Sequence, residues 1–176
     1  MIRRAFTFMD EDMFICLFKA FVRPQLEYAN AVWNPHKFKD INAIENVQRR
    51  ATKLIPNLNN LTYTERLQKL KLPTLVYRRT RGDMIETYKI LHNYNEDVTP
   101  VIKMNNTSTR GNSLKMLKFR PRKDIRKFSF TSRIVNTWNK LPDDVVNARN
   151  LITFEKLLDK FWANSNFKYD FRAPLP

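Results

Sequence analysis

The sequence contains one Asp-Asp dipeptide, Asp143-Asp144, and paired carboxylates of this kind can hold Mg²⁺ in nucleotidyl transfer. Two-metal transfer chemistry needs carboxylates arranged around both ions. Here the pair follows Leu141 and Pro142 at the expected end of a helix, and no apolar strand precedes it. Aspartate after proline is usual in turns and at helix N-caps. We therefore interpret the pair as a structural turn and expect no metal site.

The other reactive residue types are isolated. His36 and His92 have no histidine or cysteine at ligand spacing, so the sequence predicts no zinc site. Cys16 is the only cysteine and lies on an expected amphipathic helix, which predicts a small buried side chain rather than a nucleophile. With Gly82 and Gly111 as the only glycines, there is no glycine-rich phosphate-binding loop. We expect no cofactor, and no catalysis by this chain alone.

Basic residues give the strongest chemical signal. Lys and Arg total 32 against 17 Asp and Glu, a formal net charge of +15 in 176 residues. Such an excess indicates a polyanionic partner, most often nucleic acid. Cations along a phosphate backbone release condensed counterions, and the resulting affinity is largely independent of base sequence. Three groups are candidate nucleic-acid-binding residues: Arg49, Arg50 and Lys53; Arg78, Arg79 and Arg81; and Arg110, Lys115, Lys118, Arg120, Arg122, Lys123, Arg126 and Lys127.

Each group also has an ordinary explanation. Helices routinely expose basic residues to solvent, and this is the commoner explanation for a short group such as that around Arg49. In residues 110–133, nine basic residues accompany a single acid, Asp124, so few internal ion pairs are available and polyanion contact is favoured. Phe128 and Phe130 nearby either stack on unpaired bases or pack in the core.

Helical periodicity organises the first 94 residues into an expected bundle. The first expected helix has Asp10 as its N-cap. Its expected inward face consists of residues at i, i+3, i+4 and i+7: Phe14, Leu17, Phe18 and Phe21. Residues 40–55 repeat the pattern with this expected face: Ile44, Val47, Ala51 and Leu54. Thr62 and Glu65 have the spacing of a capping box, in which each side chain binds the other residue's backbone N–H. A longer helix follows Pro73.

The second half of the chain is expected to differ. The polar segment 95–109 predicts a flexible joint. In the domain at 110–164, alternating apolar and basic residues followed by Pro121 predict a small basic β-hairpin over residues 114–128. Two helices are expected to follow, one with Ile134, Val135 and Trp138 inward and one ending near Phe161. Residues 165–176 are predicted to form a loose tail. The predicted fold class is mainly α.

Blocks spread over nearly the whole chain resemble the segment that follows the palm in non-LTR retrotransposon reverse transcriptases of the jockey-like kind. The N-terminal half contributes LFKAFVRPQLEYA at 17–29, VWNP at 32–35 and ENVQRRATKLI at 45–55. The C-terminal stretch contributes TRG at 109–111, RIVN at 133–136 and WNKLP at 138–142. The order and spacing of these blocks, rather than any single block, carry the resemblance.

This resemblance implies the thumb and C-terminal region of an RNA-directed DNA polymerase without its catalytic palm. The aromatic-x-Asp-Asp motif of the family and its upstream Asp have no counterpart here. A thumb-like helical bundle would grip an RNA–DNA or RNA duplex through the phosphate backbone. Two other interpretations stay open: a half-domain that docks on a polymerase palm through exposed apolar faces, and a degenerate element remnant with no independent function.

The sequence also predicts an intracellular protein that has no membrane partner. Asp10, Glu11 and Asp12 interrupt the apolar run that a signal peptide would need. No stretch approaches the roughly 20 apolar residues of a membrane-spanning helix.

Overall fold

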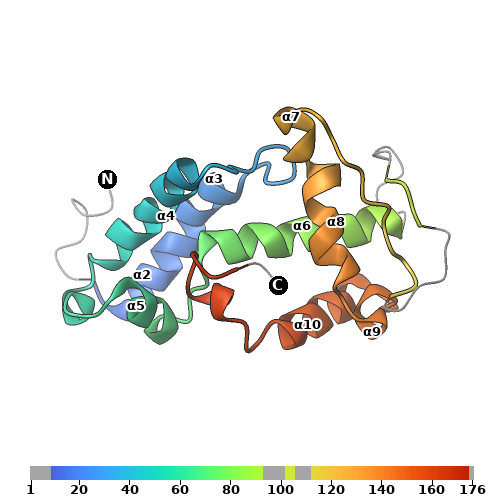
Figure 1. Ribbon diagram of the computed structural model, residues 1–176. Coiled ribbons are helices and arrows are strands. Elements are labelled where there is room, and N and C mark those ends of the chain that lie inside the picture. The colour runs from blue at the N-terminus through green and yellow to red at the C-terminus, as the bar shows by residue number, and fades with distance from the viewer. Residues whose placement is uncertain (1–8, 93–101, 106–111, 175–176) are drawn as a thin grey trace. The chain divides into compact units, whose positions relative to one another are not determined.

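The computed structural model describes residues 9–92, 102–105 and 112–174 (Figure 1). Within these ranges the regular elements are helices, so the prediction of a mainly α fold is confirmed. The chain forms two compact units. Unit 1 takes its residues from Met1–Ala29, Pro35–Arg79 and Asn166–Ala173, and unit 2 from Asn30–Asn34, Thr80–Ser165 and Pro174–Pro176. The predicted joint lies mostly outside the described residues, and the domain boundary at residue 94 stays a prediction.

Unit 1 is built from short helices around an apolar core. Its elements are α2 (Glu11–Leu17), the π-helix η1 (Phe18–Val22), α3 (Arg23–Glu27), α4 (Phe38–Thr52), the 3-10 turn η2 (Pro56–Leu58), α5 (Tyr63–Lys69), the first residues of α6 (Leu75–Leu91) and the 3-10 turn η3 (Asn166–Lys168). Phe14 and Phe18 stack with their ring centroids 5.5 Å apart in the core. Ile55, Leu58 and Leu67 pack in the same core.

The first helix has the predicted N-cap but not the whole predicted face. Asp10 caps α2, and its carboxylate accepts the Met13 N–H at 2.7 Å. Phe21, expected inward, is 66% exposed. The reason lies in η1, where the Arg23 N–H bonds to the carbonyl of Phe18, five residues earlier. Because a π-turn holds more residues than an α-turn, it rotates Phe21 away from the line of Phe14 and Phe18.

The buried face of α4 is polar, which the sequence prediction missed. Val47, expected inward, is 41% exposed. The fully buried residues of this helix are Glu45, Gln48 and Thr52, at i, i+3 and i+7. This is helical core spacing with polar side chains, and the search for apolar periodicity could not find it. The structure therefore has to supply hydrogen-bond partners for three buried polar groups.

Two further local features of unit 1 were open to prediction from sequence. The Thr62–Glu65 capping box is present at the start of α5 and confirms the prediction. The segment predicted to be a loose tail is instead packed where it is described, because Phe167 is 1% exposed and its ring centroid lies 4.9 Å from that of Tyr77. The Phe167 carbonyl also accepts a hydrogen bond from the Thr74 hydroxyl at 3.1 Å.

Unit 2 surrounds a stack of aromatic rings. Its helices are the remainder of α6, α7 (Asp124–Lys127), α8 (Phe130–Asn139), α9 (Asp143–Val146) and α10 (Leu151–Phe161). The Phe154 ring stacks between Tyr88 and Trp138, at centroid distances of 4.4 and 6.0 Å. Ile134, Val135 and Trp138 are buried, which confirms the predicted inward face of α8.

The predicted β-hairpin is not formed. Residues 125–128, the expected second strand, lie in or just after the short helix α7. Met116 pairs instead with Met104 in an isolated antiparallel bridge, with Leu117 N–H bonded to the Lys103 carbonyl at 2.8 Å. The alternation of apolar and basic residues was thus a sound sign of extended chain. The proposed partner was wrong because α7 uses the N–H of Phe128 in its own turn.

The lone cysteine also differs from expectation. Cys16 is exposed, because α2 turns the face that contains Phe14 to the core and Cys16 lies on another face of the helix. None of the described helices is long and apolar enough to cross a lipid bilayer.

Candidate nucleic-acid interface

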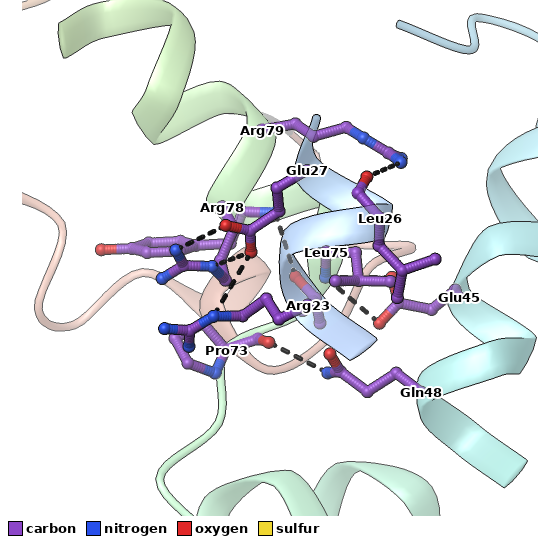
Figure 2. A network of polar contacts seen from close by, with 11 residues as sticks. Arg23, Leu26, Glu27, Glu45, Gln48, Pro73, Leu75, Arg78 and Arg79 are labelled. Carbon is purple, nitrogen blue, oxygen red and sulfur yellow. Dashed lines mark hydrogen bonds and ion pairs between the residues drawn. The ribbon is translucent and has the colours of Figure 1, made fainter. Parts of the chain in front are cut away.

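The first arginine of α6 is paired within unit 1 (Figure 2). Two nitrogens of the Arg78 guanidinium donate to the Glu27 carboxylate. Nε bonds to one carboxylate oxygen, and Nη2 bonds to the other at 2.8 Å. Arg23 lies 3.8 Å from the same carboxylate. Burial and the neighbouring Arg78 guanidinium lower the pKa of Arg23. One glutamate therefore serves two guanidinium groups, and Arg78 is not available as a free phosphate ligand.

Arg79 and Arg81 are also occupied. Arg79 is 3% exposed, and its Nη2 donates to the Leu26 carbonyl at 3.0 Å. In unit 2, Arg81 makes two hydrogen bonds to Asp159, at 2.7 and 2.9 Å, and one to Glu155 at 3.2 Å. Hydrogen bonds to Asp159 raise the pKa of Arg81 further above its ordinary value. The α6 arginines predicted as a clamp thus serve internal contacts.

The α4 group is divided. Arg49 donates to Asn46, and its guanidinium lies over the rings of Tyr63 and Phe171, at 5.1 and 5.5 Å from their centroids. Arg50 and Lys53 are exposed near the end of α4. Of this group only these two side chains present their charge to solvent.

The buried polar face of α4 is a structural network rather than a ligand site. The Glu45 carboxylate accepts the Leu75 N–H at 3.0 Å, and Gln48 donates to the Pro73 carbonyl at 3.0 Å (Figure 2). The same carboxylate accepts the Tyr63 hydroxyl at 2.6 Å. Glu45 therefore supplies an acceptor for an otherwise unsatisfied N–H at the start of α6. Burial raises the pKa of Glu45, and these hydrogen bonds partly oppose that rise.

A different arrangement begins at residue 112, where side chains fix the chain to the end of α8. Asn112 donates to the carbonyls of Trp138 and Leu141, at 3.0 and 2.9 Å. The Asn139 side chain accepts the Met116 N–H at 2.8 Å and donates to the Met116 carbonyl at 2.9 Å. These contacts hold residues 112–116 as a rigid base for the segment that follows.

Asp143, the first residue of α9 rather than part of a turn, takes part in the same anchoring. Its carboxylate accepts the Ser113 N–H at 2.7 Å and the Asn147 amide at 3.0 Å. The hydrogen bond from the Ser113 backbone is the main reason that the pKa of Asp143 is lowered. The carboxylate is therefore used in positioning the chain.

Residues 117–127, which we call the basic arm, carry most of the exposed charge of the predicted third group. The arm holds six cations and one acid, Asp124, a net charge of +5. The six cations are all exposed: Lys118, Arg120, Arg122, Lys123, Arg126 and Lys127. In the part of the chain that the structure describes, none of the six forms an ion pair. Lys115 lies in the anchored base, and Arg110 lies outside the described residues.

The basic arm borders a hollow of about 700 Å³. The C-terminal part of the arm forms α7, which lies beside the N-terminal end of α8 (Figure 1). The cations that line the hollow are Lys103, Arg120, Arg122, Lys123 and Arg126. Among its described lining residues there is no carboxylate. Lys103 was missed from the sequence because it falls in the segment assigned to the joint, and the structure brings it to the arm through the Met104–Met116 bridge.

Arg133 has an internal role that sequence reasoning did not identify. Its guanidinium donates to both Asp83 oxygens at 2.8 Å and to the Asn30 carbonyl at 2.9 Å. A Cβ at Gly82 would lie 3.2 Å from the Asn30 amide nitrogen, so a glycine at 82 suits this close approach. Arg133 thus ties α8 to α6 and to residues 30–34 within unit 2.

No family model matches this sequence, and neither curated proteins nor solved structures give a match to the chain.

Proposed function

We propose that this chain binds the phosphate backbone of nucleic acid without catalysing a reaction, and that the basic arm is the contact surface. The observation that carries the proposal is a set of six exposed cations on 117–127 with no ion pair among the described residues. Fixed cations without carboxylate partners release counterions when they meet phosphates, because their charge is not already neutralised. Arg78, Arg79 and Arg81 are left out of the contact surface.

The resemblance to reverse transcriptase thumbs supports an RNA–DNA hybrid as the ligand to test. In this proposal the chain is a fragment of a retrotransposon RNA-directed DNA polymerase, and its thumb-type binding needs no catalytic aspartate. Purified chain supplied with Mg²⁺, nucleotides and a primed template is expected to extend no primer. Measured synthesis would contradict the non-catalytic part of the proposal.

A salt titration of binding to a labelled RNA–DNA hybrid tests the proposal. For about six phosphate contacts, affinity is expected to fall at least about a thousandfold between 50 and 200 mM salt. A matched hybrid in which a peptide nucleic acid replaces one charged strand is expected to bind more weakly with a shallower salt dependence. Binding that is absent, or that ignores salt on the natural hybrid, would overturn the proposal.

A second candidate is a protein-docking half-domain, favoured by large apolar side chains that lie outside the core. Within unit 1, Phe21 is 66% exposed and Phe38 is 58% exposed. Exposed apolar groups of this size mark interaction surfaces when they are contiguous. If docking is the main role, the isolated chain is expected to self-associate as its concentration rises, and Phe21→Ser should reduce that association in sedimentation velocity.

A further inference from the structure

The hollow beside the basic arm has a lining that a phosphate backbone alone does not require. Its floor includes the buried side chains of Met116 and Val135, which are 2% and 4% exposed. Phe119 and Ile125 also line it, and they are 50% and 90% exposed. A surface that contacts only phosphates gains nothing from placing such apolar groups in water. The lining therefore points to a ligand with an apolar, planar part as well as negative charge.

We infer that the hollow receives an unpaired nucleotide, with its base against the apolar lining and its flanking phosphates on the cations of the arm. The volume of about 700 Å³ lies within the range of small-ligand sites. Unpaired bases commonly stack on exposed aromatic rings in cationic grooves. The inference rests on the proposed function and specifies its ligand: a hybrid or duplex that carries a single-stranded end.

The charged groups of the hollow come from two segments of unit 2. Arg120, Arg122, Lys123 and Arg126 come from the arm, and Lys103 comes from the segment across the Met104–Met116 bridge. The Lys103 ammonium lies 5.3 Å from the centroid of the Phe119 ring, so cation and ring are already associated. Cations from two segments that line one hollow with an aromatic ring suit a base flanked by phosphates.

Hydroxyl groups complete the lining. Thr131 and Ser132 lie in the first turn of α8 and border the hollow. Hydroxyls donate and accept hydrogen bonds, so they can meet the polar edge of any base without selecting one. The first turn of a helix also carries partial positive charge, which adds to the attraction for a phosphate. We therefore expect little preference among base types.

The test compares a blunt RNA–DNA hybrid with the same hybrid bearing a few unpaired nucleotides, and with that end made abasic. The abasic end keeps the phosphates and removes the bases. Stacking is expected to make the base-bearing end bind about 5- to 150-fold more tightly than the abasic end, for each base held. Equal binding of these two probes would overturn the inference and would favour a protein segment as the occupant of the hollow.

A variant pair places the effect on the hollow. Phe119→Ala is expected to abolish the advantage of the base-bearing end over the abasic end, a ratio measured within the variant so that any change in its general phosphate affinity cancels. Phe161→Ala is the matched control, because Phe161 is similarly exposed, at 47%, and lies in unit 2 outside the hollow. An unchanged advantage in Phe119→Ala would contradict the inference.

Failure of the inference can be told from failure of the proposed function. If all three probes bind equally and salt weakens them all, phosphate binding stands and the unpaired nucleotide does not. If no probe binds the wild-type chain at low salt, the proposed function itself fails, and the inference fails with it.

Discussion

The arginines of α6 and the cations of the basic arm have the same side-chain chemistry and opposite surroundings. Arg78 and Arg81 each meet carboxylates within their own units, whereas the arm has one acid for six cations and makes no ion pair among the described residues. The helix uses its positive charge to hold the fold. The arm, on a rigid base at 112–116, keeps its charge available. The local supply of carboxylates, rather than the number of arginines, therefore decides whether a cation holds the fold or stays available for binding.

Among the internally paired arginines, Arg133 should contribute most to stability. Arg133→Ala leaves the Asp83 carboxylate, whose side chain is 6% exposed, without its main partner. Loss of one partner from a buried ion pair costs about 3–5 kcal/mol of unfolding free energy. Urea denaturation followed by circular dichroism measures it. Arg149→Ala, at an exposed arginine of the same unit, is the control and should stay within about 0.5 kcal/mol of wild type.

The second effect concerns binding. The variant Arg122→Gln, Lys123→Gln, Arg126→Gln is expected to lower the slope of log affinity against log salt by about three. Relative to a common affinity near 1 M salt, this corresponds at about 0.1 M salt to roughly thousandfold weaker binding, about 4 kcal/mol, with stability unchanged. Fluorescence anisotropy with a labelled hybrid gives the slope.

A charge-matched control removes three cations elsewhere in unit 2. The control substitutions are Arg149→Gln, Lys156→Gln and Lys160→Gln. These three residues are exposed and do not line the hollow. Their combination should change the slope much less than the arm variant does. Equal changes in the two variants would show that total charge, and not the arm, governs binding.

The third prediction uses pH to separate two carboxylates of unit 1. Burial raises the pKa of Glu45 above that of the unfolded chain, so its protonation stabilises the fold fully below the ordinary glutamate pKa, and this stability is lost as pH rises through the folded pKa. Glu45→Gln removes this dependence, and its carbonyl can still accept the Leu75 N–H. The stability of the variant relative to wild type should therefore rise with pH.

Glu65 should give the opposite sign. Hydrogen bonds from Thr62 lower the pKa of Glu65, so the stability it contributes is present above the unfolded pKa and is lost on acidification. Glu65→Gln should therefore be less stable than wild type at neutral pH, with the difference vanishing in acid. Unfolding curves over a pH series measure both variants, and slopes of the same sign would contradict this assignment.

The smallest changes in stability and in salt slope are expected from two single substitutions, one in α6 and one in the arm. Arg81→Gln breaks a partly exposed ion-pair network and should cost about 0.2–1 kcal/mol of stability without altering the salt slope. Arg126→Gln should do the reverse, lowering the slope by about one and leaving stability unchanged. A lower slope of log affinity against log salt in Arg81→Gln would indicate that α6 also contacts the nucleic acid.

Features set within one helical turn could be predicted from the sequence. The Asp10 cap, the Thr62–Glu65 capping box and the apolar stripe of α8 depend on residues three or four positions apart. Their physics is local, so the residue types are sufficient to indicate them.

Contacts between distant residues could not be predicted in the same way. Glu27 lies 51 positions from Arg78, Asp83 lies 50 from Arg133, and Asp159 lies 78 from Arg81. Nothing in a single sequence says which carboxylate meets which guanidinium. The arm was easier to identify, because its lack of nearby acids is visible in the sequence itself.

The π-turn at Phe18–Val22 has a consequence for how this protein could change. Each residue added to a helix rotates the rest of that helix by about 100°, so the wide turn lets one continuous rod show Phe14 to the interior and Phe21 to the outside. Removing a single residue there would swing the second aromatic inward and erase an outward-facing group. Because α3 continues the same rod, a one-codon deletion would also turn Glu27 and Leu26 away from Arg78 and Arg79, so the outer surface and the interior contacts would change together.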